Sequence, residues 1–273
     1  MRADGVIVVS IPKSGTHLIS EAMHNLDFTL RGVCGAPWSQ RERTHMGYWF
    51  KRLGLLTQLC NSGSYAWEHT VGPADSAKPP MPAPWTGNKC FVIHELPLDK
   101  IDGALYRSWE ASDTVKFIFN YRDPRACLNS YVHYLRDDQH MEPAPGQLAY
   151  RAILKGLDFQ RALDFAIDDP DFPGKQHFLT SAWMLYHPDV LNVRFEDLVE
   201  SISSPSQMRN TLYRISKHVG AAHSNKSPYS RKALTFRQGT VDGWREDWKP
   251  RNLRRYSELY GRLLQTYGYG GDE

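Results

Sequence analysis

The chain has 273 residues, 41% of them hydrophobic, which is enough apolar material for the core of one large α/β domain. Its 33 Lys and Arg residues nearly balance its 30 Asp and Glu residues. This near balance of charges excludes the general basic field by which nucleic-acid-binding proteins attract their ligands. Any site for a polyanion must therefore be local.

The cysteines are spread widely along the chain, at Cys34, Cys60, Cys90 and Cys127. They form no CxxC pair, which argues against a zinc ribbon, a redox dithiol and a dense disulfide framework. The apolar run near the N-terminus spans only a few residues before Lys13, too short for a signal peptide or a membrane span. We therefore expect a cytoplasmic protein with reduced cysteines.

Short apolar runs rich in β-branched and aromatic residues predict strands at residues 6–11, 90–94, 115–121 and 190–195. Apolar residues spaced three or four apart predict helices at 16–26, 125–135, 147–167, 178–186 and 254–267. In the last helix this spacing puts Leu259, Leu263 and Tyr267 on one face. Strands that alternate with helices predict one P-loop-like α/β domain over residues 1–273, with a central parallel β-sheet flanked by helices. Such sheets bind ligands at the carboxyl ends of their strands.

Two stretches interrupt this alternation. Residues 72–88 contain five prolines, and residues 137–147 contain two more within an acidic, polar run. Both are typical of long loops, either surface insertions or substrate loops at one rim of the sheet.

The first predicted strand runs into residues 12–16, with the sequence PKSGT, where a helix is expected to begin. A cation, two hydroxyls and a glycine at a helix start can bind an anion through free backbone N–H groups and the helix dipole. The alternative is an ordinary turn capped by Ser14 or Thr16. A Walker A loop has its lysine after the second glycine, whereas Lys13 precedes Gly15, and this order disfavours a nucleotide triphosphatase.

The third predicted strand also ends at a helix start, with Arg122 followed by Asp123 and Pro124. Aspartate is a common N-cap and proline fits the first helical turn, so this segment delivers a guanidinium to the same edge of the sheet. Ser130, two helical turns further on, can face the same side. The alternative is a local ion pair between Arg122 and Asp123.

Five segments together resemble the sulfotransferases that use 3′-phosphoadenosine 5′-phosphosulfate (PAPS). Residues 12–16 resemble the 5′-phosphosulfate loop of that family, and residues 121–125 with Ser130 resemble its 3′-phosphate motif. Residues 92–97 are similar to the strand that carries the catalytic histidine, and residues 193–198 to the YEDL segment. Residues 236–239, followed by Trp244, are similar to the RKG…W loop. The segments occur in the family's order, from residue 6 to about residue 267.

This resemblance implies roles for individual residues. His94 would be the base that takes a proton from the acceptor, and Lys13 would stabilise the oxygen of the leaving 5′-phosphate. Glu95 is the second choice as base. The residues expected to bind PAPS are Lys13, Ser14, Gly15, Thr16, His17, Leu18, Arg122, Ser130, Phe195, Arg237, Gln238 and Gly239. No metal is implied, since an HExxH zinc motif would need histidine at Leu98.

The chain departs from the family pattern at several of these positions. Leu18 stands where many members have tryptophan, Phe195 where they have tyrosine, and Gln238 where they have lysine.

The resemblance implies transfer of the sulfuryl group from PAPS to a hydroxyl or amine of a small-molecule acceptor, with adenosine 3′,5′-bisphosphate as the second product. The alternatives are a P-loop-like small-molecule kinase and a nucleotide-binding protein without catalysis. We expect no nucleic-acid or membrane partner, and a homo-oligomer stays possible. Aromatic residues between the first two predicted strands can wall an acceptor pocket or simply pack in the core: Trp38, Tyr48, Trp49, Phe50, Tyr65, Trp67 and Trp85.

Overall fold

The computed structural model describes residues 2–32, 88–96, 115–137, 145–199, 205–224, 226, 228 and 241–271. Several features singled out above lie outside these residues: most of the two proline-containing loops, the aromatic residues from Trp38 to Trp85, Cys34, Cys60, Arg237, Gln238 and Gly239.

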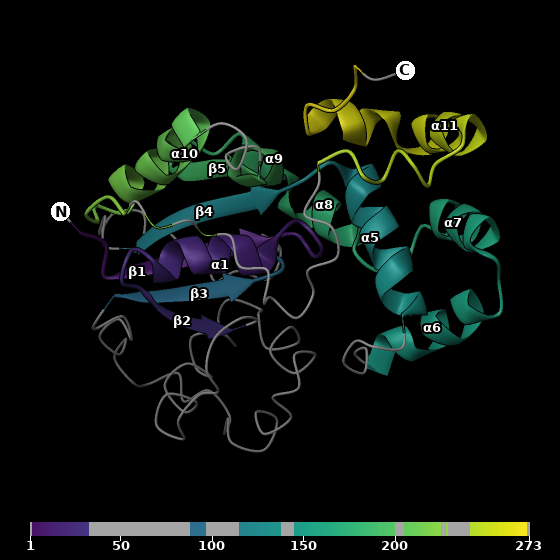
Figure 1. The fold of residues 1–273 in the computed structure, drawn as a ribbon, viewed down its shortest axis with the longest axis horizontal. Coiled ribbons are helices and arrows are strands. Elements are labelled where there is room, and N and C mark those ends of the chain that lie inside the picture. The colour runs from purple at the N-terminus through teal and green to yellow at the C-terminus, as the bar shows by residue number, and fades with distance from the viewer. Residues whose placement is uncertain are drawn as a thin grey trace, which may run out of the picture.

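The described chain forms a parallel sheet of five strands in the order β2-β3-β1-β4-β5 (Figure 1). Its strands are β1 (Gly5–Ser10), β2 (Thr29–Gly32), β3 (Lys89–Ile93), β4 (Val115–Tyr121) and β5 (Val190–Arg194). The predicted α/β fold with a central parallel sheet is confirmed, and so are the four predicted strands. The short β2 at the edge of the sheet was not predicted.

The helices flank this sheet on both faces. They are α1 (Thr16–His24), α5 (Pro124–Arg136), α6 (Leu148–Lys155), α7 (Phe159–Asp168), α8 (Lys175–Ser181), α9 (Phe195–Val199), α10 (Pro205–His218) and α11 (Pro250–Thr266), with short 3₁₀ turns η3 (Pro145–Gln147) and η4 (Ala182–Leu185). The single helix predicted over 147–167 is wrong, because the structure divides it into α6 and α7. The Asp158 side chain accepts a hydrogen bond of 2.9 Å from the Arg161 N–H and starts α7 afresh.

Successive side chains of a strand point to opposite faces of the sheet, and each face packs against its own hydrophobic core. Val6 and Val8 of β1 face a cluster completed by α1 and α10, whereas Ile7 and Val9 face a larger cluster that includes residues of α5, α7 and α11. A strand whose two faces are both buried reads as a continuous apolar run, which is why β1 was easy to recognise in the sequence.

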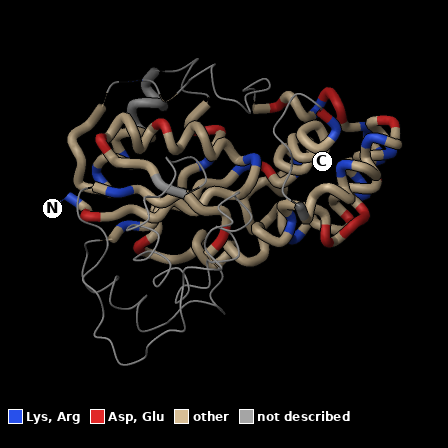
Figure 2. Tube along the Cα trace, turned by 90° about the horizontal axis from the view of Figure 1, so that it is seen from below, with Lys and Arg blue, Asp and Glu red and all other residues tan. Residues whose placement is uncertain are grey.

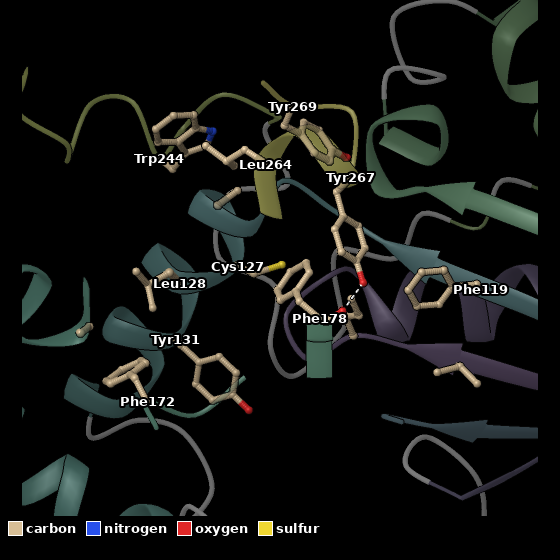
Figure 3. Close-up of a cluster of buried hydrophobic side chains, with 14 of the residues drawn as sticks. Phe119, Cys127, Leu128, Tyr131, Phe172, Phe178, Trp244, Leu264, Tyr267 and Tyr269 are labelled. Carbon is tan, nitrogen blue, oxygen red and sulfur yellow. Dashed lines mark hydrogen bonds between the residues drawn. The ribbon is translucent and has the colours of Figure 1, made fainter. Parts of the chain in front are cut away.

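Aromatic side chains tie the C-terminal helix to the sheet. Tyr267, just after α11, donates a hydrogen bond of 2.6 Å from its hydroxyl to the Phe178 carbonyl on α8, and its ring lies 6.2 Å from that of Phe119 on β4 (Figure 3). The sequence placed Leu259 on this buried face, yet it is 42% exposed, since the buried face of α11 runs through Tyr256 and Leu264 instead.

Acidic and basic residues are interspersed over the described surface (Figure 2). On α11, Arg251 and Arg255 form ion pairs of 2.9 and 2.8 Å with Asp164 and Asp168 of α7. These arginines therefore belong to an ion-paired, solvated face. Cys90 and Cys127 are buried free thiols. Across the described ranges, no helix combines the length and apolarity needed to cross a membrane.

We expect Phe119→Ala to lower the free energy of unfolding by about 3–5 kcal/mol, because it leaves a cavity where a fully buried ring lies between Tyr121 and Tyr267. Urea denaturation followed by circular dichroism measures the change. Leu179→Ala on α8, where the side chain is 61% exposed, is the control and should stay within about 0.5 kcal/mol of wild type. A loss at Phe119 no larger than that of the control would contradict this view of the core.

Candidate active site

The carboxyl ends of four neighbouring strands bring the candidate residues to one edge of the sheet. Parallel pairing sets Val9 beside Ile93, Ser10 beside Asn120, and Tyr121 beside Arg194. The residues that follow β1, β3, β4 and β5 consequently emerge together, and in Figure 1 the arrowheads of β3 and β4 point towards α5 and α8. Central β1 is hydrogen-bonded to β3 on one side and to β4 on the other. In open parallel sheets of this kind, ligands usually bind at the carboxyl ends of the central strands.

The turn after β1 has an unusual backbone. Lys13 and Gly15 both have positive φ angles, 69° and 87°. Glycine adopts such angles freely, whereas for lysine the left-handed conformation costs about 1 kcal/mol or more, and strained positions of this kind are enriched at functional sites. Gly15 is the N-cap of α1 and has no side chain to cap the helix, so the partial positive charge of the helix start is not offset by a side-chain cap and favours an anion there.

A buried network of hydroxyls and one amide holds this turn. Asn120 of β4 donates from its amide nitrogen to the Ser10 hydroxyl at 2.9 Å and to the Ser14 carbonyl and hydroxyl at 3.0 Å. The Ser14 hydroxyl itself donates to the Ile11 carbonyl at 2.6 Å, and the Ser10 and Thr16 hydroxyls lie 2.9 Å apart. Ser14 is completely buried, and its hydroxyl, carbonyl and N–H all form hydrogen bonds within the turn or with β4, so this residue holds the turn in place.

The Lys13 ammonium lies near aromatic rings of α5, 4.2 Å from the centre of Tyr134 and 6.0 Å from that of Tyr131. Burial lowers the pKa of Lys13 to about 8, and the neighbouring Arg122 guanidinium acts in the same direction. Below that pH the side chain carries a poorly hydrated positive charge, which is well suited to pairing with an anion.

The His94 ring is anchored to the end of β1. Its Nδ1 lies 2.8 Å from the Ser10 carbonyl oxygen, and since a carbonyl only accepts, Nδ1 must carry the proton. Nε2 of the neutral ring is then the basic nitrogen. Burial lowers the pKa of His94 to about 4, so the ring is neutral at physiological pH.

Glu95 and His177 adjoin this histidine. The Glu95 carboxylate lies 4.0 Å from Nε2 of His177, which belongs to α8. The ring centres of His177 and His94 are 6.2 Å apart in an edge-to-face arrangement. A single residue on α8 therefore contacts both candidate bases.

Arg122 lies against the ring of Phe195, with its Cζ 4.1 Å from the ring centre. The same ring approaches Gly15 so closely that a Cβ there would come within 2.5 Å of Phe195 Cδ2. Phe195 is thus packed between the turn after β1 and the arginine after β4. The alternative ion pair of Arg122 with Asp123 is not what the structure shows. Asp123 caps α5 and pairs with Arg125 at 2.8 Å.

Three other predicted residues lie further along helices. Ser130 lies on α5 and is partly exposed, His17 is exposed in the first turn of α1, and Leu18 is partly buried and packs against the core cluster on the α1 side. Leu18 therefore contributes at least part of its side chain to the core.

Ser10, Asn120 and His177 were not recognised in the sequence as parts of this site. A signal existed for two of them, because Ser10 and Asn120 are polar residues at the ends of otherwise apolar runs, and a polar side chain buried in a strand needs a partner. His177 gave no such signal, since α8 reaches the site only through the tertiary fold.

Taken together, the edge of the sheet offers a lysine, an arginine and a helix N-terminus for an anion, and a neutral imidazole able to accept a proton. Within the described ranges, no three His, Cys, Asp or Glu residues are grouped so as to hold a metal ion.

Comparison with known proteins finds likeness in structure and none in sequence. No protein-family model matches the chain, and neither does any curated protein sequence. The fold is similar to that of mouse sulfotransferase SULT7A1 complexed with PAP, with a TM-score of 0.52 and 17% identity over 99% of this chain and 88% of the other. Retinol dehydratase in complex with androsterone and inactive cofactor PAP also matches, with a TM-score of 0.49 and 16% identity over 97% of this chain and 82% of the other. The chain thus has the α/β fold of a known sulfotransferase.

Proposed function

We propose that this protein is a PAPS-dependent sulfotransferase that transfers a sulfuryl group to a hydroxyl or amine of a small-molecule acceptor. The observation that carries the proposal is the double role of Ser10, whose carbonyl orients the His94 base while its hydroxyl helps to hold the anion-binding turn. This double role of Ser10 would fix the proposed base beside the proposed anion site. The fold shared with mouse sulfotransferase SULT7A1 supports the same function.

The residues at the sheet edge fit the charges of PAPS. Lys13 and the start of α1 would hold the 5′-phosphosulfate, since the lysine is cationic and the N-terminus of a helix carries partial positive charge. Arg122 would hold the 3′-phosphate, because a guanidinium can bind a phosphate with two parallel hydrogen bonds. Ser130, Arg237 and Gly239 are proposed to complete this pocket, and Phe195 to pack beside the nucleotide.

PAPS supplies an activated sulfuryl group, and the residues of the chain make its transfer possible. His94 Nε2 accepts the proton as the acceptor oxygen or nitrogen forms its bond to sulfur. The bond from sulfur to the 5′-phosphate oxygen breaks, and the electron pair stays on that oxygen. Lys13 offsets the growing negative charge there, as expected for transfer reactions dominated by positioning and electrostatics.

The low pKa of His94 suits this role. A neutral ring is ready to accept a proton over the whole physiological range, and a negatively charged donor beside it would raise its pKa once bound. The ring thus becomes more basic only when the complex has formed.

The proposal is tested with purified protein, PAPS labelled in the sulfuryl group, and a pool of small hydroxylated and amine acceptors. Sulfated product together with adenosine 3′,5′-bisphosphate is the expected result. Turnover of ATP in place of PAPS would identify a kinase, and tight binding of PAPS without product would identify a nucleotide-binding protein without catalysis.

We expect His94→Ala to lower kcat by about 10²–10⁴-fold, since the base is lost. Lys13→Ala should lower kcat by about 10²–10³-fold, since charge on the leaving oxygen is no longer offset. Steady-state kinetics measures both effects. His24→Ala, at the exposed end of α1, is the matched control and should retain wild-type turnover. If His94→Ala kept its activity, the base would have to be Glu95 or the substrate itself.

The pKa values predict a bell-shaped dependence of kcat/KM for PAPS on pH. His94 must be unprotonated, so activity should fall as pH decreases through about 4, and Lys13 must be protonated, so activity should fall as pH rises through about 8. The 3′-phosphate of PAPS ionises near pH 6 and adds its own inflection, as phosphate monoesters do. Lys13→Arg isolates the lysine contribution, because arginine stays charged and should move the alkaline limb upward. An alkaline limb unchanged in Lys13→Arg would assign it to another group.

Arg122→Ala should raise the KM for PAPS by about ten-fold or more with a smaller effect on kcat, because a charge-assisted contact to a group remote from the reacting sulfur is lost. Arg122→Lys should recover only part of the affinity, since an ammonium cannot form the two-pronged contact. Loss of kcat with unchanged KM would instead place Arg122 beside the reacting group.

A further inference from the structure

Residues 241–248, here called the strap, lie along one face of α5. In Figure 1 they form the segment that leads into α11 and passes over α5. The strap contacts α5 and the residues before it at four positions: Arg122, Arg125, Asn129 and His133. Arg125, Asn129 and His133 follow one another at four-residue steps along α5, which keeps these three side chains on one side of the helix, and Arg122 lies just before its N-terminus.

The first part of the strap touches the arginines at the start of α5. Arg122 Nη2 donates to the Val241 carbonyl at 3.4 Å. The buried ring of Trp244 lies 4.7 Å from Cζ of Arg125, the arginine that pairs with Asp123. The strap therefore contacts Arg122, the residue proposed to bind the 3′-phosphate, and packs on the ion pair between Arg125 and Asp123 at the N-terminus of α5.

The far part of the strap is anchored by Asp247. One of its carboxylate oxygens, Oδ2, accepts hydrogen bonds of 2.8 Å from both Asn129 Nδ2 and His133 Nε2. Gln160 of α7 donates to the Asp247 carbonyl at 2.7 Å, and the indole of Trp248 donates to Asn129 Oδ1 at 3.2 Å. Asn129 and Trp248 are buried, so the bond between them is shielded from water, whereas Asp247 and His133 are partly exposed. The four bonds together restrict the strap at this end.

We propose that the strap positions Arg122 for the 3′-phosphate of the nucleotide, with Asp247 as the positioning residue that fixes it. This inference rests on the proposed function. The Phe195 ring lies 4.1 Å from Cζ of Arg122 and the Val241 carbonyl accepts from Nη2, and these two contacts restrict the orientation of the guanidinium before any ligand binds. An arginine held in this way loses less conformational freedom on binding than a mobile one.

The consequence is selectivity. A strap that fixes Arg122 strengthens binding only of ligands that reach it, namely nucleotides with a 3′-phosphate. Adenosine 5′-monophosphate has the same base, ribose and 5′-phosphate and lacks that group. The ratio of the two affinities therefore reports the placement of Arg122, whereas general damage to the fold would weaken both ligands alike.

The test compares full-length wild type, Asp247→Ala and Asp247→Asn by isothermal titration calorimetry with adenosine 3′,5′-bisphosphate and adenosine 5′-monophosphate. In Asp247→Ala the affinity for the bisphosphate should fall about ten-fold while that for the monophosphate is unchanged. Asp247→Asn keeps one acceptor oxygen and should lie between this variant and wild type. The control is Asp168→Ala, which removes a carboxylate that also accepts a 2.8 Å bond from another element, Arg255 on α11, but lies outside the strap. It should bind both ligands as wild type does.

Equal weakening of both ligands in Asp247→Ala, or an unchanged ratio, would overturn the inference and leave the proposed function intact. If wild type showed no preference for the bisphosphate, the proposed function itself would fail. Should Asp247→Ala not fold, His133→Leu removes one of the two donors to Asp247 and should shift the ratio in the same direction by a smaller factor. An unchanged ratio in that variant would overturn the inference as well.

Discussion

Ser10 is the residue on which the arrangement of the site depends. Its carbonyl accepts from His94 and its hydroxyl bonds with Thr16 and Asn120. One position on the central strand thus sets His94, the proposed base, and the turn proposed to bind the anion relative to each other. All three bonds start from a strand that is paired on each side and completely buried, so the rigid sheet fixes the distance between His94 and the turn.

Other contacts join the turn after β1 to neighbouring segments. Asn120 bonds the turn to β4, and Phe195 packs between the turn and Arg122. Two cations are thereby held close together before any anion is present. Burial is the main cause of the lowered pKa of Lys13, and repulsion from Arg122 adds to it. A ligand that carries two separated negative groups would relieve that repulsion at both positions, which matches the charge distribution of PAPS.

Much of this architecture could be predicted from the sequence, and the exceptions have physical causes. Buried strands are recognisable because both faces are apolar, whereas β2 is a four-residue edge strand with a charged residue in it. The apolar spacing over 147–167 continues across Gly156 and hides the break that Asp158 makes by capping α7. The lysine, the histidine and the arginine were found because each follows a strand. Two features of the site could not be predicted in this way: the inward direction of the Ser14 hydroxyl and the contact of His177 with His94. Both depend on how distant segments pair in the fold, and the local sequence pattern carries no information about such pairings.

The contacts of the strap with Arg125, Asn129 and His133 also set a common length for the strap and this part of α5. Each residue turns a helix by about 100°, so one residue inserted or deleted between Arg125 and His133 would rotate the later contact positions away from the strap. Such a change would separate the Asp247 anchor from the arginine it serves, even though every side chain involved was still present. Among descendants of this sequence, substitutions in α5 and the strap should thus be far better tolerated than changes of length.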